Sequence, residues 1–122
     1  MVHSINERQD VYERLSRALI KAYKFYEENH EETIDIMLKY VKIDRDVLTS
    51  ETYDGNFSPN PNPGKERIKV FWDKMNEIKY IESDIDIEDH INTEIYTNAL
   101  ESLLKENPDD PVYLKLKEEL TE

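Results

Sequence analysis

The residues best suited to chemistry are carboxylates, and three of them alternate along one short stretch. Asp84, Asp86 and Glu88 stand at every second position, a spacing that calcium-binding loops use. A calcium loop that began at Asp84 would need a glycine at its sixth position and a bidentate glutamate at its twelfth. The chain has Asp89 and Ile95 at those positions. We therefore interpret the stretch as a solvated acidic turn, with a looser cation site as the alternative.

Histidine is the side chain that most readily changes charge near neutral pH, and the three histidines lie far apart at His3, His30 and His90. The pair His30-Glu31 does not extend to the zinc-protease pattern, because the residue four positions after His30 is Ile34. We interpret His30 as an exposed residue in the first turn of a helix and His90 as a half-buried residue of a short turn. None of the three is expected to be a metal ligand or a catalytic base.

The other catalytic patterns are missing from the sequence. The chain has no cysteine, which excludes disulfides, thiolate metal sites and cysteine nucleophiles. Two glycines are too few for a glycine-rich phosphate loop, and no serine lies in a Gly-x-Ser-x-Gly elbow. Carboxylates are abundant, but nothing in the sequence marks a buried acid–base pair. We therefore expect no enzyme, no catalytic residues, no cofactor and no metal site, and the sequence defines no ligand-binding residues.

The chain has eight tyrosines, and six of them fall on or at the ends of expected helices. These six are Tyr12, Tyr23, Tyr26, Tyr40, Tyr80 and Tyr96. Tyrosine is enriched at protein interfaces, so some of them could form a recognition surface. We favour the plainer interpretation, in which the rings lie at the edge of the core and the hydroxyls reach water.

Length and charge narrow the class of protein. The 122 residues suit a single domain, 1–122. Lys and Arg number 16 against 28 Asp and Glu, and the net charge of −12 repels nucleic acids and anionic membranes. We expect no nucleic-acid partner.

Only 38% of the residues are hydrophobic, below the roughly 45–50% of ordinary globular domains. The core is therefore lean, and a missing partner surface would matter.

The sequence predicts neither a membrane span nor an export signal. No apolar run approaches the roughly 18 residues that a spanning helix needs. The segment from Met1 to Arg8 has neither the basic start nor the apolar stretch of a secretory signal. As written, the chain is expected to be cytoplasmic. If it is a fragment of an exported protein, we expect an extracytoplasmic or membrane-associated location.

Apolar residues recur at steps of three and four almost throughout, which predicts an all-α fold of about six helices in an irregular bundle. The helices are expected over residues 10–28, from 30 onward, 44–52, 65–80, 93–106 and from 111 onward. Asn29, with Glu32 three residues later, forms a capping pattern for the second helix. Asn92 is expected to cap the fifth helix, and Pro111 suits the first turn of the last.

The apolar stripes predict which side chains form the core. The stripe of the first helix is wide enough for burial on more than one side. Its members are Val11, Leu15, Ala18, Leu19, Ala22 and Tyr26, widened by Ile20, Tyr23 and Phe25. The later helices are expected to bury Ile34, Met37, Leu38, Val41, Val47, Leu48, Ile68, Phe71, Trp72, Met75, Ile78, Ile95, Tyr96, Ala99, Leu100, Leu103, Leu104, Val112, Leu116 and Leu120.

Two segments are expected to lack long helices. Residues 53–64 contain Pro59, Pro61 and Pro63, and each proline fixes its own φ and drives the preceding residue toward an extended conformation. We predict an extended surface loop, with a proline-rich docking peptide as the alternative. Residues 82–89 are acidic and β-branched, and we interpret them as a connector that ends in a helical turn over 87–90.

The order of these elements resembles the C-terminal part of ABC-transporter substrate-binding proteins. The similar subgroup serves nitrate, sulfonates and taurine and includes the thiamine-pyrimidine precursor proteins. The resemblance covers residues 10–104. It depends first on the helix before Asn29 and on Asn29, Glu31 and Glu32, with His30 where the family has proline. Further along the chain the matching residues are Lys39 and Tyr40, Asp44 to Leu48, and Tyr53, Phe57, Pro59, Pro61 and Pro63. The last matches are the helix from Ile68 to Tyr80 and the residues Asn92 and Thr93.

The resemblance implies a function in transport. Members of the family close two α/β lobes around a small ligand, and those lobes are missing from this chain, so no binding residue is carried over. The chain would be the C-terminal helical portion of a solute-binding protein for small organic molecules or anions, and it would brace the lobes rather than hold ligand. The alternative is a free-standing acidic helical module that binds protein. Expected partners are the missing α/β lobes or another protein, and the isolated chain is expected to form homo-oligomers.

Overall fold

The computed structural model describes residues 7–120, and every regular element in this range is helical. The elements are α2 (Gln9–Glu28), α3 (His30–Met37), α4 (Arg45–Tyr53), α5 (Lys65–Glu77), the 3₁₀ turn η1 (Ile87–His90), α6 (Glu94–Glu106) and α7 (Pro111–Glu118). The prediction of an all-α fold with about six helices is confirmed. None of the described helices is long and apolar enough to cross a membrane.

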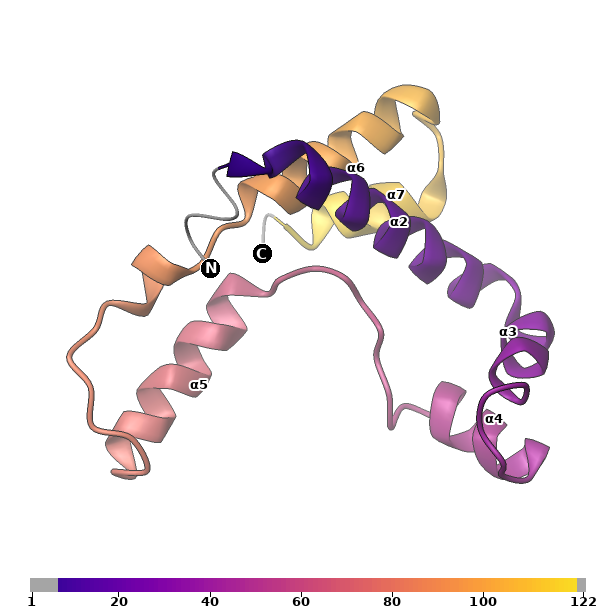
Figure 1. Ribbon diagram of the computed structural model, residues 1–122, viewed down its shortest axis with the longest axis horizontal. Helices are drawn as coiled ribbons and strands as arrows, with labels where there is room; N and C mark the ends of the chain where they lie inside the picture. Colours follow the sequence, from indigo (N-terminus) through magenta and orange to yellow (C-terminus); the bar gives the residue numbers. More distant parts are fainter. Residues whose placement is uncertain (1–6, 121–122) are drawn as a thin grey trace.

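The helices form an open arch (Figure 1). At the top of the arch, α2 lies against α6, and α7 packs on both. The pair α3 and α4 continues from the end of α2, and α5 lies at the other side of the arch. Among the described elements, α5 packs on η1 alone. The arch therefore has a body made of α2, α6 and α7, and an arm made of α5.

The core lies between the three helices of the body. Its side chains come from one face of α6, which the sequence predicts correctly, and from parts of α2 and α7. They are Ile20, Tyr23, Tyr96, Ala99, Leu100, Leu103, Tyr113 and Leu116. Tyr26, Leu104, Val112 and Leu120 pack against this cluster and are partly buried. Tyr113 is the core residue that the apolar pattern missed.

Asp110 fixes the start of α7. Its carboxylate accepts hydrogen bonds from the backbone N–H groups of Val112 and Tyr113, at 3.1 and 3.2 Å. Pro111 occupies the first turn, where its missing N–H costs no helical bond. Asn92 accepts from the N–H of Glu94 at 2.9 Å, but the N-cap of α6 is Thr93, one residue after the predicted cap. The position of Pro111 in the first turn of α7 is as predicted.

The face of α2 that enters the core differs from the predicted one. Ile20 and Tyr23 are buried, whereas Leu15 and Leu19 are 54% and 52% exposed. Ala18, Ala22 and Phe25 are exposed as well. The prediction that this stripe is covered is wrong for the described chain.

Polar contacts on the inward side of α2 explain the difference. Arg17 Nη2 pairs with Glu106 Oε1 of α6 at 2.7 Å, and Lys24 pairs with the Asp110 carboxylate at the start of α7. These ion pairs flank Ile20 and hold the charged side of α2 against the body. The most regular apolar stripe of α2 is thereby turned outward.

The α3–α4 pair is joined to α2 by stacked rings. Tyr53 stacks on Tyr26 with ring centroids 4.7 Å apart and on His30 at 3.9 Å. The Tyr26 hydroxyl donates to the carbonyl of Thr52 at 2.5 Å, and the Tyr53 hydroxyl donates to the carbonyl of Tyr26 at 2.9 Å. These reciprocal bonds fix the angle at which α4 meets α2.

Two predictions about this pair are wrong. The Asn29 side chain does not cap α3, because its amide donates back to the carbonyl of Phe25 at 3.2 Å and so satisfies the C-terminal end of α2. Val47 is exposed, whereas Leu48 beside it and Ile34 of α3 are buried. Val41 is exposed too. A two-helix pair has only one inner seam, so it cannot cover a broad stripe.

The arm α5 buries no residue. Phe71 is 65% exposed and Ile78 is 66% exposed, and Ile68 is exposed as well. The prediction that this stripe faces a core is therefore wrong within the described chain. The helix ends at Glu77 rather than Tyr80, since Lys79 takes a left-handed backbone conformation with φ 58°.

Candidate functional site

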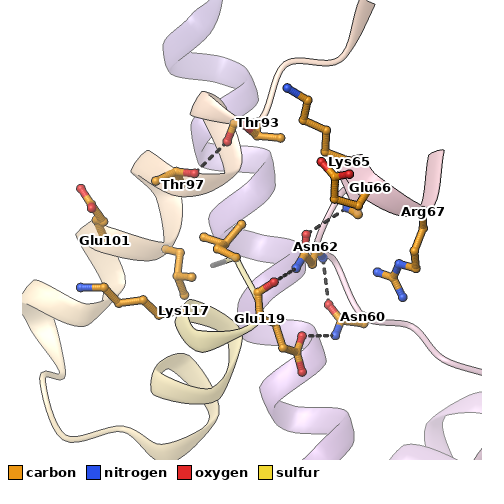
Figure 2. Close-up of a pocket in the computed structure, with 13 residues that line it drawn as sticks. Asn60, Asn62, Lys65, Glu66, Arg67, Thr93, Thr97, Glu101, Lys117 and Glu119 are labelled. Carbon is orange, nitrogen blue, oxygen red and sulfur yellow. Dashed lines mark hydrogen bonds between the residues drawn. The ribbon is translucent and has the colours of Figure 1, made fainter. Parts of the chain in front are cut away.

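A polar cavity lies where the proline segment enters the arm (Figure 2). Its volume is about 920 Å³. The walls come from the proline segment, the first turn of α5, one face of α6 and the last turn of α7. The lining residues are Asn60, Asn62, Gly64, Lys65, Glu66, Arg67, Thr93, Thr97, Leu100, Glu101, Lys117, Glu119 and Leu120.

Two asparagines hold the floor of the cavity together. Asn60 Nδ2 donates to Glu119 Oε2 at 2.7 Å, and Asn62 Nδ2 donates to the backbone oxygen of Glu119 at 3.4 Å. Each asparagine also accepts a bond from the backbone N–H two residues later, Asn60 from Asn62 and Asn62 from Gly64, both at 2.9 Å. Such turns fix a local backbone geometry. The alternating prolines and asparagines therefore tie the entry of α5 to the end of α7.

Gly64 is needed where the segment turns into α5. Its φ is 62°, in the left-handed region that glycine adopts without strain. A Cβ at this position would come within 2.7 Å of Arg67 Nε, whose side chain folds over it. The turn thus sets the direction in which the arm leaves the body.

The charges around the cavity balance. Lys65, Arg67 and Lys117 line it together with Glu66, Glu101 and Glu119, so the lining has three cations and three carboxylates. Lys65 is also engaged outside the cavity, in a pair with Glu88 at 3.1 Å. The hydroxyls of Thr93 and Thr97 complete the polar lining, and Thr97 donates to the carbonyl of Thr93 at 3.0 Å. This lining supports a hydrated, structural role better than nucleophilic or acid–base chemistry.

The acidic stretch contributes to the packing of the arm. Asp86 accepts from the N–H of Glu88 at 3.0 Å and so caps η1. Glu88 pairs with Lys69 and Lys65 of α5. Hydrogen bonds from these two lysines, together with their charges, hold the pKa of Glu88 below its ordinary value. Among residues 7–120, no group of three or more His, Asp and Glu side chains is arranged to hold a metal ion.

The histidines do not come together. His30 is exposed, as predicted, and stacks on Tyr53. His90 ends η1 and is also exposed, so its prediction as half-buried is wrong. The short turn packs on α5 through Glu88 rather than through its last residue. His3 lies outside the described residues.

The tyrosines divide into two groups. Tyr40 and Tyr80 are largely exposed. Tyr23 and Tyr96 are buried. For Tyr96 the prediction that the hydroxyl reaches water is wrong, because that oxygen is itself buried. Burial, with the charges of Glu27 and Glu119, raises the pKa of Tyr23 to about 12. Burial also raises the pKa of Tyr96 well above its ordinary value.

Changing Tyr96 to phenylalanine tests the cost of its hydroxyl, which has no hydrogen-bond partner within the described chain. A buried polar group without a partner destabilises the folded state by about 1–3 kcal/mol. We therefore expect Tyr96→Phe to raise the free energy of unfolding, by about 1 kcal/mol, in urea titrations followed by circular dichroism. Tyr53→Phe, which removes a bonded hydroxyl, is the control and should lower it. A clear loss of stability in Tyr96→Phe would contradict this account.

Two apolar faces form a second candidate site, for protein rather than for a small ligand. The α2 face consists of Leu15, Ala18, Leu19, Ala22 and Phe25, and the α5 face consists of Ile68, Phe71, Met75 and Ile78. The whole chain exposes 9111 Å². A compact monomer of this mass exposes about 6,900 Å². The chain therefore exposes about 2,200 Å² more than a compact monomer would.

Comparison with known proteins adds no relative from which a function could be transferred. No family model, no curated protein sequence and no solved structure matches the chain. The candidate sites are therefore judged by their own geometry.

Proposed function

We propose that the chain is a helical interaction module, without catalytic activity, that binds protein through the α2 face and the α5 face. The observation that carries the proposal is the arm itself. An amphipathic helix of 13 residues exposes most of its apolar side, with Trp72 and Met75 only partly buried, and no residue of it is buried in the described chain. Exposed apolar patches of this kind mark sites of association.

Energetics support this proposal. Burying a phenylalanine or isoleucine side chain contributes about 1.5–3 kcal/mol. Phe71 and Ile78 alone therefore offer several kcal/mol to a partner that covers them. The lean core of the body makes such a contribution large relative to the stability of the free chain.

The polar cavity supports the same proposal. Its hydrogen bonds run between the proline segment and α7, so their effect is to orient the arm. Covalent catalysis would need a nucleophile activated by a neighbouring base. The hydroxyls in the cavity belong to Thr93 and Thr97, and Thr97 donates to the carbonyl of Thr93 rather than to a base.

In a second candidate function, a pair of α/β lobes covers the α2 face and the α5 face. The order of elements over residues 10–104 resembles the C-terminal part of nitrate, sulfonate and taurine binding proteins. In such a protein the module would brace the lobes of an ABC importer's solute-binding protein, outside the cytoplasm. The uncovered α2 and α5 faces favour this second candidate as well as a free-standing module, because both need a surface to cover them.

Site-specific photocrosslinking in the organism that encodes the chain tests the proposal. Benzoylphenylalanine is introduced at Phe71 or at Leu19, with Leu114 of α7 as the exposed control outside both faces. We expect a covalent adduct of defined mass from both test positions and none from the control. Mass spectrometry of the adduct distinguishes α/β lobes from a separate partner. Absence of adducts at both faces would contradict the proposed function.

A further inference from the structure

The arm, helix α5, makes few contacts with the rest of the molecule. Non-helical segments flank α5 on both sides, over residues 54–64 and 79–86. Its ion pairs to other elements go to Glu88 of η1, the short turn that packs on α5. The α5 face is therefore free of the body throughout its length.

The root of the arm keeps α5 from folding back onto its own α2. Asn60 and Asn62 donate hydrogen bonds to Glu119, and three prolines stiffen the segment between α4 and α5. The left-handed turn at Gly64 then directs α5 away from the body. Among residues 7–120, η1 is the only element that packs on the arm, and none covers the α5 face from the body.

The α2 face matches the α5 face in length. The α2 face runs from Leu15 to Phe25, and the α5 face from Ile68 to Ile78, so each spans ten residue steps. At 1.5 Å per residue, both faces are about 15 Å long. Small side chains at Ala18 and Ala22 leave room between the larger residues of α2 for a projecting ring such as Phe71.

The uncovered area fits a second copy of the chain. The excess of about 2,200 Å² per chain is close to what each partner buries in a large homodimer, for which the total is roughly 2,000–5,000 Å². A reciprocal contact uses both faces at once. The α5 face of one copy covers the α2 face of its partner, and the partner's arm does the same in return.

Charge also favours contact through these two helices. Two copies repel each other, because each carries a net charge of −12. Helix α2 has four basic and four acidic residues, and α5 has four basic and three acidic ones. These helices therefore carry 0 and +1, and the acidic excess lies elsewhere. Association through α2 and α5 brings the least like charge together.

We propose that the chain forms a two-fold symmetric dimer in which α5 of each copy packs on the α2 face of the other. This proposal rests on the proposed interaction function and names its partner as a second copy. It requires the two arms to be exchanged reciprocally, with Phe71 of one chain beside Ala18 and Ala22 of the other.

Cysteine crosslinking of the 122-residue chain tests the contact directly, since the chain has no cysteine of its own. Ala18→Cys and Phe71→Cys are made as separate proteins, mixed and oxidised with copper phenanthroline. We expect a disulfide-linked heterodimer in the mixture. Val70→Cys replaces Phe71→Cys in the control; this residue is exposed but lies about 100° around the helix. The yield of disulfide-linked heterodimer from Val70→Cys and Ala18→Cys should be at least tenfold lower than the yield from Phe71→Cys and Ala18→Cys.

Light scattering across micromolar concentrations provides the second measurement. We expect a mass of about twice 14.6 kDa, and a dissociation constant at least tenfold weaker in Phe71→Ser than in Val70→Ser. Circular dichroism confirms that both variants keep their helices. A monomer at all concentrations overturns the proposal, and so does a dimer whose crosslinks miss Ala18 and Phe71. A disulfide within one chain of the Ala18→Cys/Phe71→Cys double variant also overturns it.

These outcomes separate the dimer from the broader function. A monomer that still yields photocrosslinks to another protein at Phe71 overturns the dimer and leaves the interaction function intact. A closed monomer, with a disulfide within the chain and no adducts, overturns both.

Discussion

Leu103→Ala is expected to lower the free energy of unfolding by about 3 kcal/mol. Leu103 is fully buried, with 0% of its surface exposed, and it lies in the cluster shared by α2, α6 and α7. Truncation removes favourable burial and leaves a cavity that the three short helices fill only in part. A domain of this size has a total stability on the order of 5–15 kcal/mol, so the effect is a large share of it.

Urea titration at a fixed protein concentration measures this loss, with helix content as the signal. Leu114→Ala is the matched control, because Leu114 lies on α7 but is exposed. Its effect should stay within about 0.5 kcal/mol. A similar loss in both variants would mean that the body is not the principal core of the protein.

The sequence predicts the buried face of α6 well, because there the apolar pattern and the actual packing agree. On α6, the predicted stripe contains Tyr96, Ala99, Leu100 and Leu103, and all four are buried. The start of α7 follows from Asp110 and Pro111 for a local reason. Capping depends on neighbouring residues alone, so tertiary structure does not have to be known.

On α2 and α5 the apolar pattern and the packing disagree. The stripe with Leu15 and Leu19 is more regular than the side with Ile20, yet Ile20 is the buried residue. The buried face of α2 depends on Arg17 and Lys24, which meet acidic partners 89 and 86 residues later in the chain. Periodicity cannot detect such long-range pairs. On α5 the pattern correctly predicts an amphipathic helix. Its apolar face is not covered by any element of the described chain.

The polar cavity could be predicted only in part. The alternating prolines indicate an extended segment, which the structure confirms. The role of Asn60 and Asn62 becomes visible only when Glu119 is brought beside them by α7. Their spacing between prolines is the one sequence signal that could have identified them, because asparagine side chains commonly close turns of this kind.

The coupling of Asp110 to Lys24 explains how the last helix is held on the body. Burial alone would raise the pKa of the Asp110 carboxyl, but bonds from Lys24 and from the N–H groups of Tyr113 and Val112, with the charge of Lys24, outweigh it. The pKa of Asp110 therefore lies below its ordinary value, and the hydrogen bond that Lys24 donates to Asp110 raises the pKa of Lys24. Folding therefore stabilises the charged forms of both side chains, the carboxylate of Asp110 and the ammonium of Lys24.

Asp110→Ala is expected to lower the free energy of unfolding by about 2–3 kcal/mol. The variant loses the cap of α7, which contributes about 1 kcal/mol, and leaves the partly buried ammonium of Lys24 without its partner. Asp110→Asn keeps a cap acceptor and removes only the charge, so its loss should be smaller. Equal losses in the two variants would show that the cap contributes nothing.

The pH dependence of the same variants tests the ion pair. A carboxyl whose pKa is lowered on folding adds stability that is fully present above its unfolded pKa, about 3.9. That stability is lost as the pH falls through the lower pKa of the folded state. The advantage of the native chain over Asp110→Asn should therefore be constant from about pH 5 to 7 and shrink below about pH 4. An advantage that persists unchanged into this acidic range would mean that α7 is held by the cap and by apolar contacts, with no contribution from the charge of Asp110.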